Sequence, residues 1–108
     1  MAIKLPHIVQ RYVDSSNQHD VQSILSCFSD DAVVRDEGET LRGRKIIEEW
    51  ITRTIQKYKF NFNPLTVKGD SAEIVVEVEV SGAFDGSPVT LDYHFVIESD
   101  KIPSLTIE

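Results

Sequence analysis

A change in hydrophobic period near residue 59 constrains the fold of this 108-residue chain most strongly. Before that point apolar residues recur every three or four positions, as on one face of an α-helix. After it they alternate with polar residues, as in half-buried strands. The alternation is clearest in residues 72–82, AEIVVEVEVSG, and in residues 89–97, VTLDYHFVI, with a hairpin-turn signal at Asp85-Gly86 between them. Helices followed by hairpin strands predict an α+β fold, with the helices gathered on one face of an antiparallel sheet.

The first half divides into three predicted helices and one strand. Residues 5–17 and 21–28 carry apolar stripes at helical spacing, and Asp20 suits the N-cap of the second helix. Residues 29–36, SDDAVVRD, have the pattern of a short strand. Residues 44–58, RKIIEEWITRTIQKY, predict a long helix with a broad apolar stripe.

The strands of the second half carry two further signals. Pro64 in KFNFNPLTV indicates a bulge or an edge position, because proline cannot donate a ladder hydrogen bond. In the run 89–97, strand parity places Tyr93 and Phe95 on one face and directs Asp92 to the other. The segment SLTIE then predicts a short last strand.

Composition narrows the class of protein. Hydrophobic residues make up 41% of the chain, enough for one core, so we expect a single domain over residues 1–108. A net charge of −7 argues against a nucleic-acid partner, which needs a basic surface. Apolar runs are too short to cross a membrane, and the N-terminus lacks the apolar region of a signal peptide, so we expect a cytoplasmic protein. The single cysteine, Cys27, and the absence of CxxC or HxxxH spacing predict no disulfide and no metal site, and we also expect no cofactor.

Two residues stand out as candidates for chemistry, and the pattern alone leaves each with two interpretations. Asp36 shares its strand face with Val34 and Ala32 and would then point inward, but it could equally lie past the strand end and cap the following turn. Tyr12 lies on an apolar helix stripe, where a tyrosine can serve either as packing or as a polar group at a pocket.

The segment IVQRYVDSSNQHDVQSILSCFSDDAVVRD, followed by TLRGRKIIEEW, resembles the nuclear transport factor 2-like superfamily, in the branch of ketosteroid isomerase and the SnoaL-like polyketide cyclases. A His94-Phe95 pair extends the resemblance into the second half. It implies a cystatin-like cone, in which a curved antiparallel sheet wraps around a long helix and leaves a pocket for a small apolar or aromatic ligand. It also implies a homodimer formed through the outer face of the sheet.

The resemblance also assigns roles to residues. In ketosteroid isomerase an aspartate base moves a proton while two hydrogen-bond donors hold the enolate oxygen. By position, the base corresponds to Asp36 and one donor to Tyr12. The second donor, a carboxylic acid in the family, corresponds to Tyr93, which is a departure that a phenol O–H can still fill.

These assignments predict an isomerase or cyclase that moves a proton on an apolar carbonyl substrate with Asp36 as the general base. The alternative is a noncatalytic ligand-binding or dimerisation module on the same fold, which the replaced second donor favours. In either case we expect five further side chains to form the substrate-contacting wall: Phe28, Val34, Trp50, Leu91 and Phe95.

Overall fold

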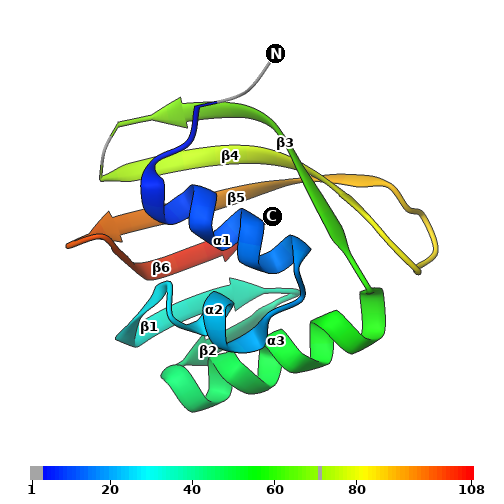
Figure 1. Cartoon of the computed structure of the whole chain (residues 1–108), viewed down its shortest axis with the longest axis horizontal. Helices are drawn as coiled ribbons and strands as arrows, with labels where there is room; N and C mark the ends of the chain where they lie inside the picture. The colour runs from blue at the N-terminus through cyan, green and yellow to red at the C-terminus, as the bar shows by residue number, and fades with distance from the viewer. Residues whose placement is uncertain (1–3, 71) are drawn as a thin grey trace.

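The computed structural model of the chain describes residues 4–70 and 72–108, which form three helices and six strands (Figure 1). The helices are α1 (His7–Asn17), α2 (Val21–Leu25) and α3 (Arg44–Tyr58). The strands are β1 (Phe28–Asp36), β2 (Glu39–Arg42), β3 (Asn61–Gly69), β4 (Glu73–Ser81), β5 (Val89–Glu98) and β6 (Lys101–Ile107). Within these residues no helix is long and apolar enough to cross a membrane.

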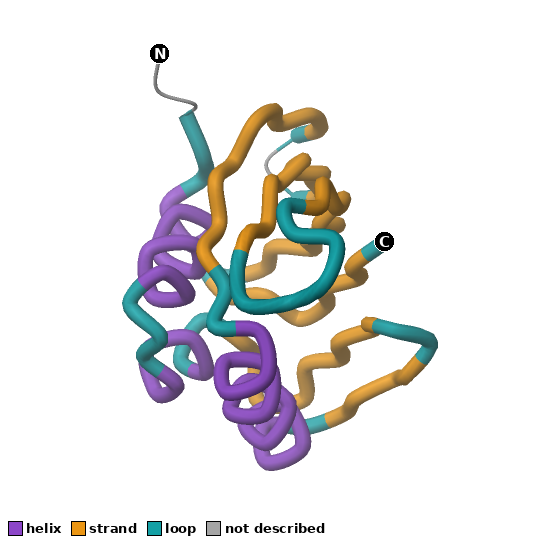
Figure 2. Tube along the Cα trace, turned by 90° about the vertical axis from the view of Figure 1, so that its right-hand side faces the viewer, coloured by secondary structure: helices purple, strands orange, loops and turns teal. Residues whose placement is uncertain are grey.

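The strands form one curved sheet in the order β2-β1-β6-β5-β4-β3, which leaves β2 and β3 at its two edges. All neighbours are antiparallel except β1 and β6, which run parallel. The helices lie on one side of the strands, as Figure 2 shows. Helix α3 packs on β1 and β2, and α1 packs on β3 and α2. The α+β fold with helices on one face of a curved sheet is therefore confirmed, and the parallel β1–β6 pair is a feature that the hydrophobic pattern did not predict.

Alternation along the strands builds the core. Every second residue of β4, from Ile74 to Val80, is buried, whereas Glu77 and Glu79 between them are only partly covered. On β5, Tyr93 and Phe95 are buried and Asp92 is exposed, as strand parity predicts. The apolar face of the sheet thus turns toward the helices.

Strand β3 lies at an edge of the sheet, and two features shape it. Its register with β4 shifts between Pro64 and Thr66, which confirms the bulge predicted at the proline. The side chain of Asn17 pairs with the backbone of Phe62: its Oδ1 accepts from the Phe62 N–H at 2.7 Å and its Nδ2 donates to the Phe62 carbonyl at 3.1 Å. The end of α1 therefore covers part of this exposed edge.

The largest departure from the predicted elements is β2, which the sequence pattern did not reveal. Residues 39–42 contain one buried side chain, Leu41, so they carry no alternation that could be recognised. The strand forms because Glu37 and Gly38 adopt positive φ angles of 53° and 78°, and fold the chain back on β1. Helix α2 is also shorter than predicted, because β1 already begins at Phe28.

Candidate functional site

A cavity of about 240 Å³ lies between the helices and the inner face of the sheet. Side chains from all three helices, from β1, β3, β4, β5 and β6, and from the loop between β4 and β5 line it, and most of them are apolar or aromatic. Apolar walls with a few convergent polar groups are typical of small-molecule sites. The polar groups here include Tyr12, Asp36, Glu37 and Tyr93.

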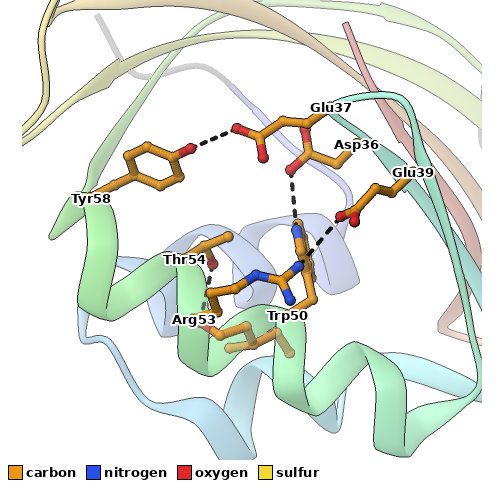
Figure 3. A network of polar contacts seen from close by, with 8 residues as sticks. Asp36, Glu37, Glu39, Trp50, Arg53, Thr54 and Tyr58 are labelled. Atoms are coloured by element: carbon orange, nitrogen blue, oxygen red, sulfur yellow. Dashed lines mark hydrogen bonds and ion pairs between the residues drawn. The ribbon is translucent and has the colours of Figure 1, made fainter.

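Asp36 is the last residue of β1, and its side chain points into this cavity. Val34 and Ala32, two and four residues before it, are fully buried, so strand parity aims Asp36 inward as well. Its Oδ2 atom accepts a hydrogen bond of 3.1 Å from the indole Nε1 of Trp50 on α3 (Figure 3). Of the two interpretations that the sequence left open, the inward one describes the geometry, because Asp36 still pairs with Glu39 inside the ladder.

The environment of Asp36 favours its protonated form. Burial raises the pKa of this carboxyl group above its ordinary value of 3.8, and the neighbouring charge of Glu37 adds to the rise. The Trp50 hydrogen bond acts in the opposite direction but is outweighed. A carboxylate with a raised pKa is a stronger base than an exposed one, which suits proton transfer.

Tyr12 on α1 and Tyr93 on β5 bring two phenol groups to the same cavity. Both residues are buried, with exposed fractions of 3% and 4%. Burial raises the pKa of both hydroxyl groups, and the nearby charge of Asp36 contributes to each rise. Both phenols therefore stay protonated and able to donate a hydrogen bond.

The Tyr93 hydroxyl is open to the cavity. It has no hydrogen-bond partner among residues 4–70 and 72–108, yet no fully buried polar side-chain atom of that part of the chain lacks a partner. Its oxygen must therefore be reachable from the cavity. A donor that has no protein partner and opens on the cavity is available to a ligand.

The predicted wall residues divide into two groups. Trp50 and Leu91 line the cavity. Phe28, Val34 and Phe95 do not line it, and lie instead in the closed core with exposed fractions of 0%, 0% and 2%. In front of Phe28 and Phe95 the space is filled by α1: the Tyr12 ring meets these two rings edge-on, at centroid distances of 5.8 and 5.5 Å. Phe28 and Phe95 therefore pack against the ring of Tyr12.

The sequence did not reveal the mouth of the cavity, where Glu37, Tyr58, Phe84 and Asp85 gather. The Tyr58 hydroxyl donates to Glu37 Oε1 at 2.6 Å (Figure 3). The Tyr58 ring meets the Phe84 ring edge-on at a centroid distance of 5.5 Å. Gly82 allows this approach, since a Cβ atom there would lie 2.4 Å from the Tyr58 carbonyl oxygen. The turn signal at Asp85 marked the hairpin loop, but nothing in it indicated that the loop returns to the end of α3.

No metal centre is present among the described residues. They contain no group of three or more His, Cys, Asp or Glu side chains that could hold an ion. Cys27 is fully buried, and burial raises the pKa of its thiol, so it behaves as a small core residue.

Comparisons with known proteins agree with this geometry. A family model of the SnoaL-like domain matches residues 9–101. A Sinorhizobium meliloti protein provisionally assigned as a polyketide cyclase is 36% identical, with a TM-score of 0.92 and coverage of 96% of this chain and 95% of that chain. No curated protein matches.

Two more distant structures share the fold. A Catenulispora acidiphila protein with a ketosteroid isomerase-like fold, solved in complex with trimethylamine, is 18% identical with a TM-score of 0.84, covering 97% of this chain and 86% of that chain. The epoxide hydrolase/cyclase-like enzyme SalBIII, which has a role in pyran ring formation in the polyether salinomycin, is 19% identical with a TM-score of 0.82, covering 93% and 85%.

Proposed function

The chain belongs to the SnoaL-like domain family of the nuclear transport factor 2-like superfamily, and from this premise we propose that it binds a small, mostly apolar carbonyl compound and moves a proton on it, as an isomerase or a cyclase. The observation that carries the proposal is the position of Asp36, a partly buried carboxylate in an apolar cavity that also holds the Tyr12 and Tyr93 hydroxyls. The provisional assignment of the S. meliloti protein as a polyketide cyclase supports the same class of chemistry.

In the proposed reaction Asp36 removes a proton from a carbon next to the substrate carbonyl, and the electron pair moves onto the carbonyl oxygen. Tyr12 and Tyr93 donate hydrogen bonds to that oxygen as it becomes negative. In an isomerase, protonated Asp36 returns the proton to another carbon of the same molecule. In a cyclase, the enolate carbon attacks a second carbonyl of the substrate, whose oxygen takes up the proton. Trp50 holds the carboxylate in place through its N–H.

Conversion of 3-cyclohexen-1-one into its conjugated isomer, followed by ultraviolet absorbance, tests the base. Asp36→Asn should lower the rate by about 100-fold or more, because general-base catalysis contributes about 10²–10⁴. Asp92→Asn, on the exposed face of β5, makes the same chemical change away from the cavity and should leave the rate unaltered. Equal rates for the wild type and Asp36→Asn would remove Asp36 from the reaction.

A second candidate function is ligand binding without turnover. It is favoured by Tyr93, which stands where the resemblance places a carboxylic acid, because a phenol is a weaker acid and a weaker oxyanion donor. This candidate predicts that small ketones raise the melting temperature of the wild type and of Asp36→Asn alike, with no conversion by either.

We also propose a cytoplasmic homodimer formed through the outer face of the sheet. A shallow depression on that face includes Val75 of β4 and His94 and Val96 of β5. Light scattering after size exclusion should give the mass of two chains, and Val96→Lys should give the mass of one. The lone, buried Cys27 suits a reducing compartment.

A further inference from the structure

Apart from tyrosines, the ionisable side chains that line the cavity are all acidic among the described residues. The carboxyl groups of Asp36, Glu37 and Asp85 line it, and no lysine, arginine or histidine of the described residues does. Two cations lie near but outside it: Arg53 pairs with Glu39 at 3.4 Å, and the Lys57 Nζ lies 5.0 Å from the centroid of the Tyr58 ring. The walls of the cavity therefore present negative charge to whatever enters.

Aromatic rings make up much of the remaining surface. Tyr12, Trp50, Tyr58, Phe62, Phe84 and Tyr93 are among the lining residues. The face of an aromatic ring carries partial negative charge and attracts cations within about 6 Å, more strongly where water is excluded. Such rings and the carboxylates act in the same direction on a positive ligand.

The polar groups that line the cavity lie at two depths, some at its mouth and others in its interior. Glu37 and Asp85 are exposed and lie at the mouth with Tyr58 and Phe84, whereas the unpartnered Tyr93 hydroxyl lies deep in the cavity. An apolar ligand that carries a cation at one end and an oxygen at the other would match both groups at once. A ligand with a carboxylate would be repelled at the mouth.

We propose that the natural ligand is an apolar carbonyl compound that bears a cationic amine, with the ammonium group held at the mouth by Glu37, Asp85 and the Tyr58 and Phe84 rings. This inference rests on the proposed function, in that it names the substrate class of the same cavity. The carbonyl end lies deeper, within reach of Asp36 and Tyr93. Electrostatic attraction at the mouth thus orients the substrate as well as selecting it.

The test compares phenyltrimethylammonium with tert-butylbenzene, its uncharged analogue of the same shape. Trp50 is the only tryptophan of the chain and lines the cavity, so its fluorescence reports binding of either compound. At low salt the cation should bind about tenfold more tightly or better, and added salt should reduce this preference.

Two matched double variants test which carboxylates cause the tighter binding of the cation. The double variant Glu37→Gln with Asp85→Asn removes two charges at the mouth and should abolish most of the preference for the cation. The amide oxygen introduced at position 37 can still accept the hydrogen bond from Tyr58. Glu77→Gln with Asp92→Asn removes the same two charges on neighbouring positions of β4 and β5, away from the cavity, and should preserve the preference. Equal affinity for the two compounds, failure of both to bind, or a preference that survives the mouth variant would overturn the inference.

The two proposals can fail separately, because this test measures binding and not turnover. A preference for the cation combined with equal ketone isomerisation by the wild type and Asp36→Asn would overturn the general base alone. Loss of isomerisation in Asp36→Asn with no preference for the cation would overturn the amine-bearing substrate alone.

Discussion

Replacement of Asp36 by Asn should stabilise the protein at neutral pH. The carboxylate lies partly buried beside Glu37, and both features raise the free energy of its charged form in the folded state. Asparagine has the same shape, and its amide oxygen can keep the hydrogen bond from Trp50 Nε1. The substitution therefore removes the cost of holding a charge without opening a hole in the cavity wall.

The sign of the pH dependence follows from the direction of the pKa shift. The folded pKa of Asp36 lies above 3.8, its ordinary value, so between the two values the folded state binds more protons than the unfolded state. Stability of the wild type consequently falls as pH rises through this interval. Below this pH interval Asp36 is protonated in both the folded and the unfolded state. The substitution Asp36→Asn then replaces one neutral side chain by another.

For each unit by which the folded pKa of Asp36 exceeds the unfolded one, the charged carboxylate lowers the free energy of unfolding of the wild type by about 1.4 kcal/mol at neutral pH. Partial exposure of Asp36 limits the effect, and we expect a gain of about 0.5–2 kcal/mol, in the usual range for a single stabilising substitution. A gain of 1 kcal/mol corresponds to a rise in melting temperature of about 4–8 °C for a domain of this size.

Urea unfolding at pH 7.5 and at pH 3.5, followed by circular dichroism, measures the difference in unfolding free energy. The gain should be present at pH 7.5 and absent at pH 3.5. Asp92→Asn, on the exposed face of β5, serves as the control and should show no such dependence. Destabilisation of Asp36→Asn at pH 7.5, or an equal gain at both pH values, would contradict this prediction.

Two further predictions concern the end of α1 and the loop that joins it to α2. Asn17→Ala should lower the unfolding free energy by about 1–3 kcal/mol in urea, because it leaves both backbone groups of Phe62 without their side-chain partner. Asp20→Ala should lower the melting temperature at pH 7, and this loss should shrink as the pH falls below 3.8. The backbone N–H of Ser23 holds the pKa of Asp20 below its ordinary value, so its stabilising effect is lost as the carboxylate becomes protonated.

The sheet and the long helix could be predicted because their residues carry strong periodic signals. The buried positions of β4 and β5 follow directly from alternation, and α3 has the predicted bounds, Arg44–Tyr58. Strand β2 and the parallel pairing of β1 with β6 could not be predicted in this way. A four-residue edge strand has too few side chains to show a period, and pairing between strands that are distant in the chain leaves no mark on either one.

The sequence predicted those features of the candidate site that depend on a single helix or strand, such as the direction in which a side chain points. Strand parity directs Asp36 inward, and the resemblance to the superfamily pointed to Tyr12 and Tyr93. The depth of each side chain was not predictable, because it depends on what packs in front. Phe95 and Tyr93 share a face of β5, yet only Tyr93 reaches the cavity, since the Tyr12 ring covers Phe95.

The mouth of the cavity lies where the sheet fails to close. This position explains why acidic side chains surround the mouth and why no periodic pattern in the sequence predicted it. Strands β2 and β3 lie at opposite edges, and the space between them is bordered by the end of α3, the turn at Glu37 and the loop at Phe84. Each of these three segments ends a different element, so no single period contains them. Termini and turns favour polar residues, and here they place acidic side chains around an apolar interior. The same geometry that leaves a cavity thus supplies it with negative charge, so selection for a cationic ligand requires no residue beyond those that end the elements.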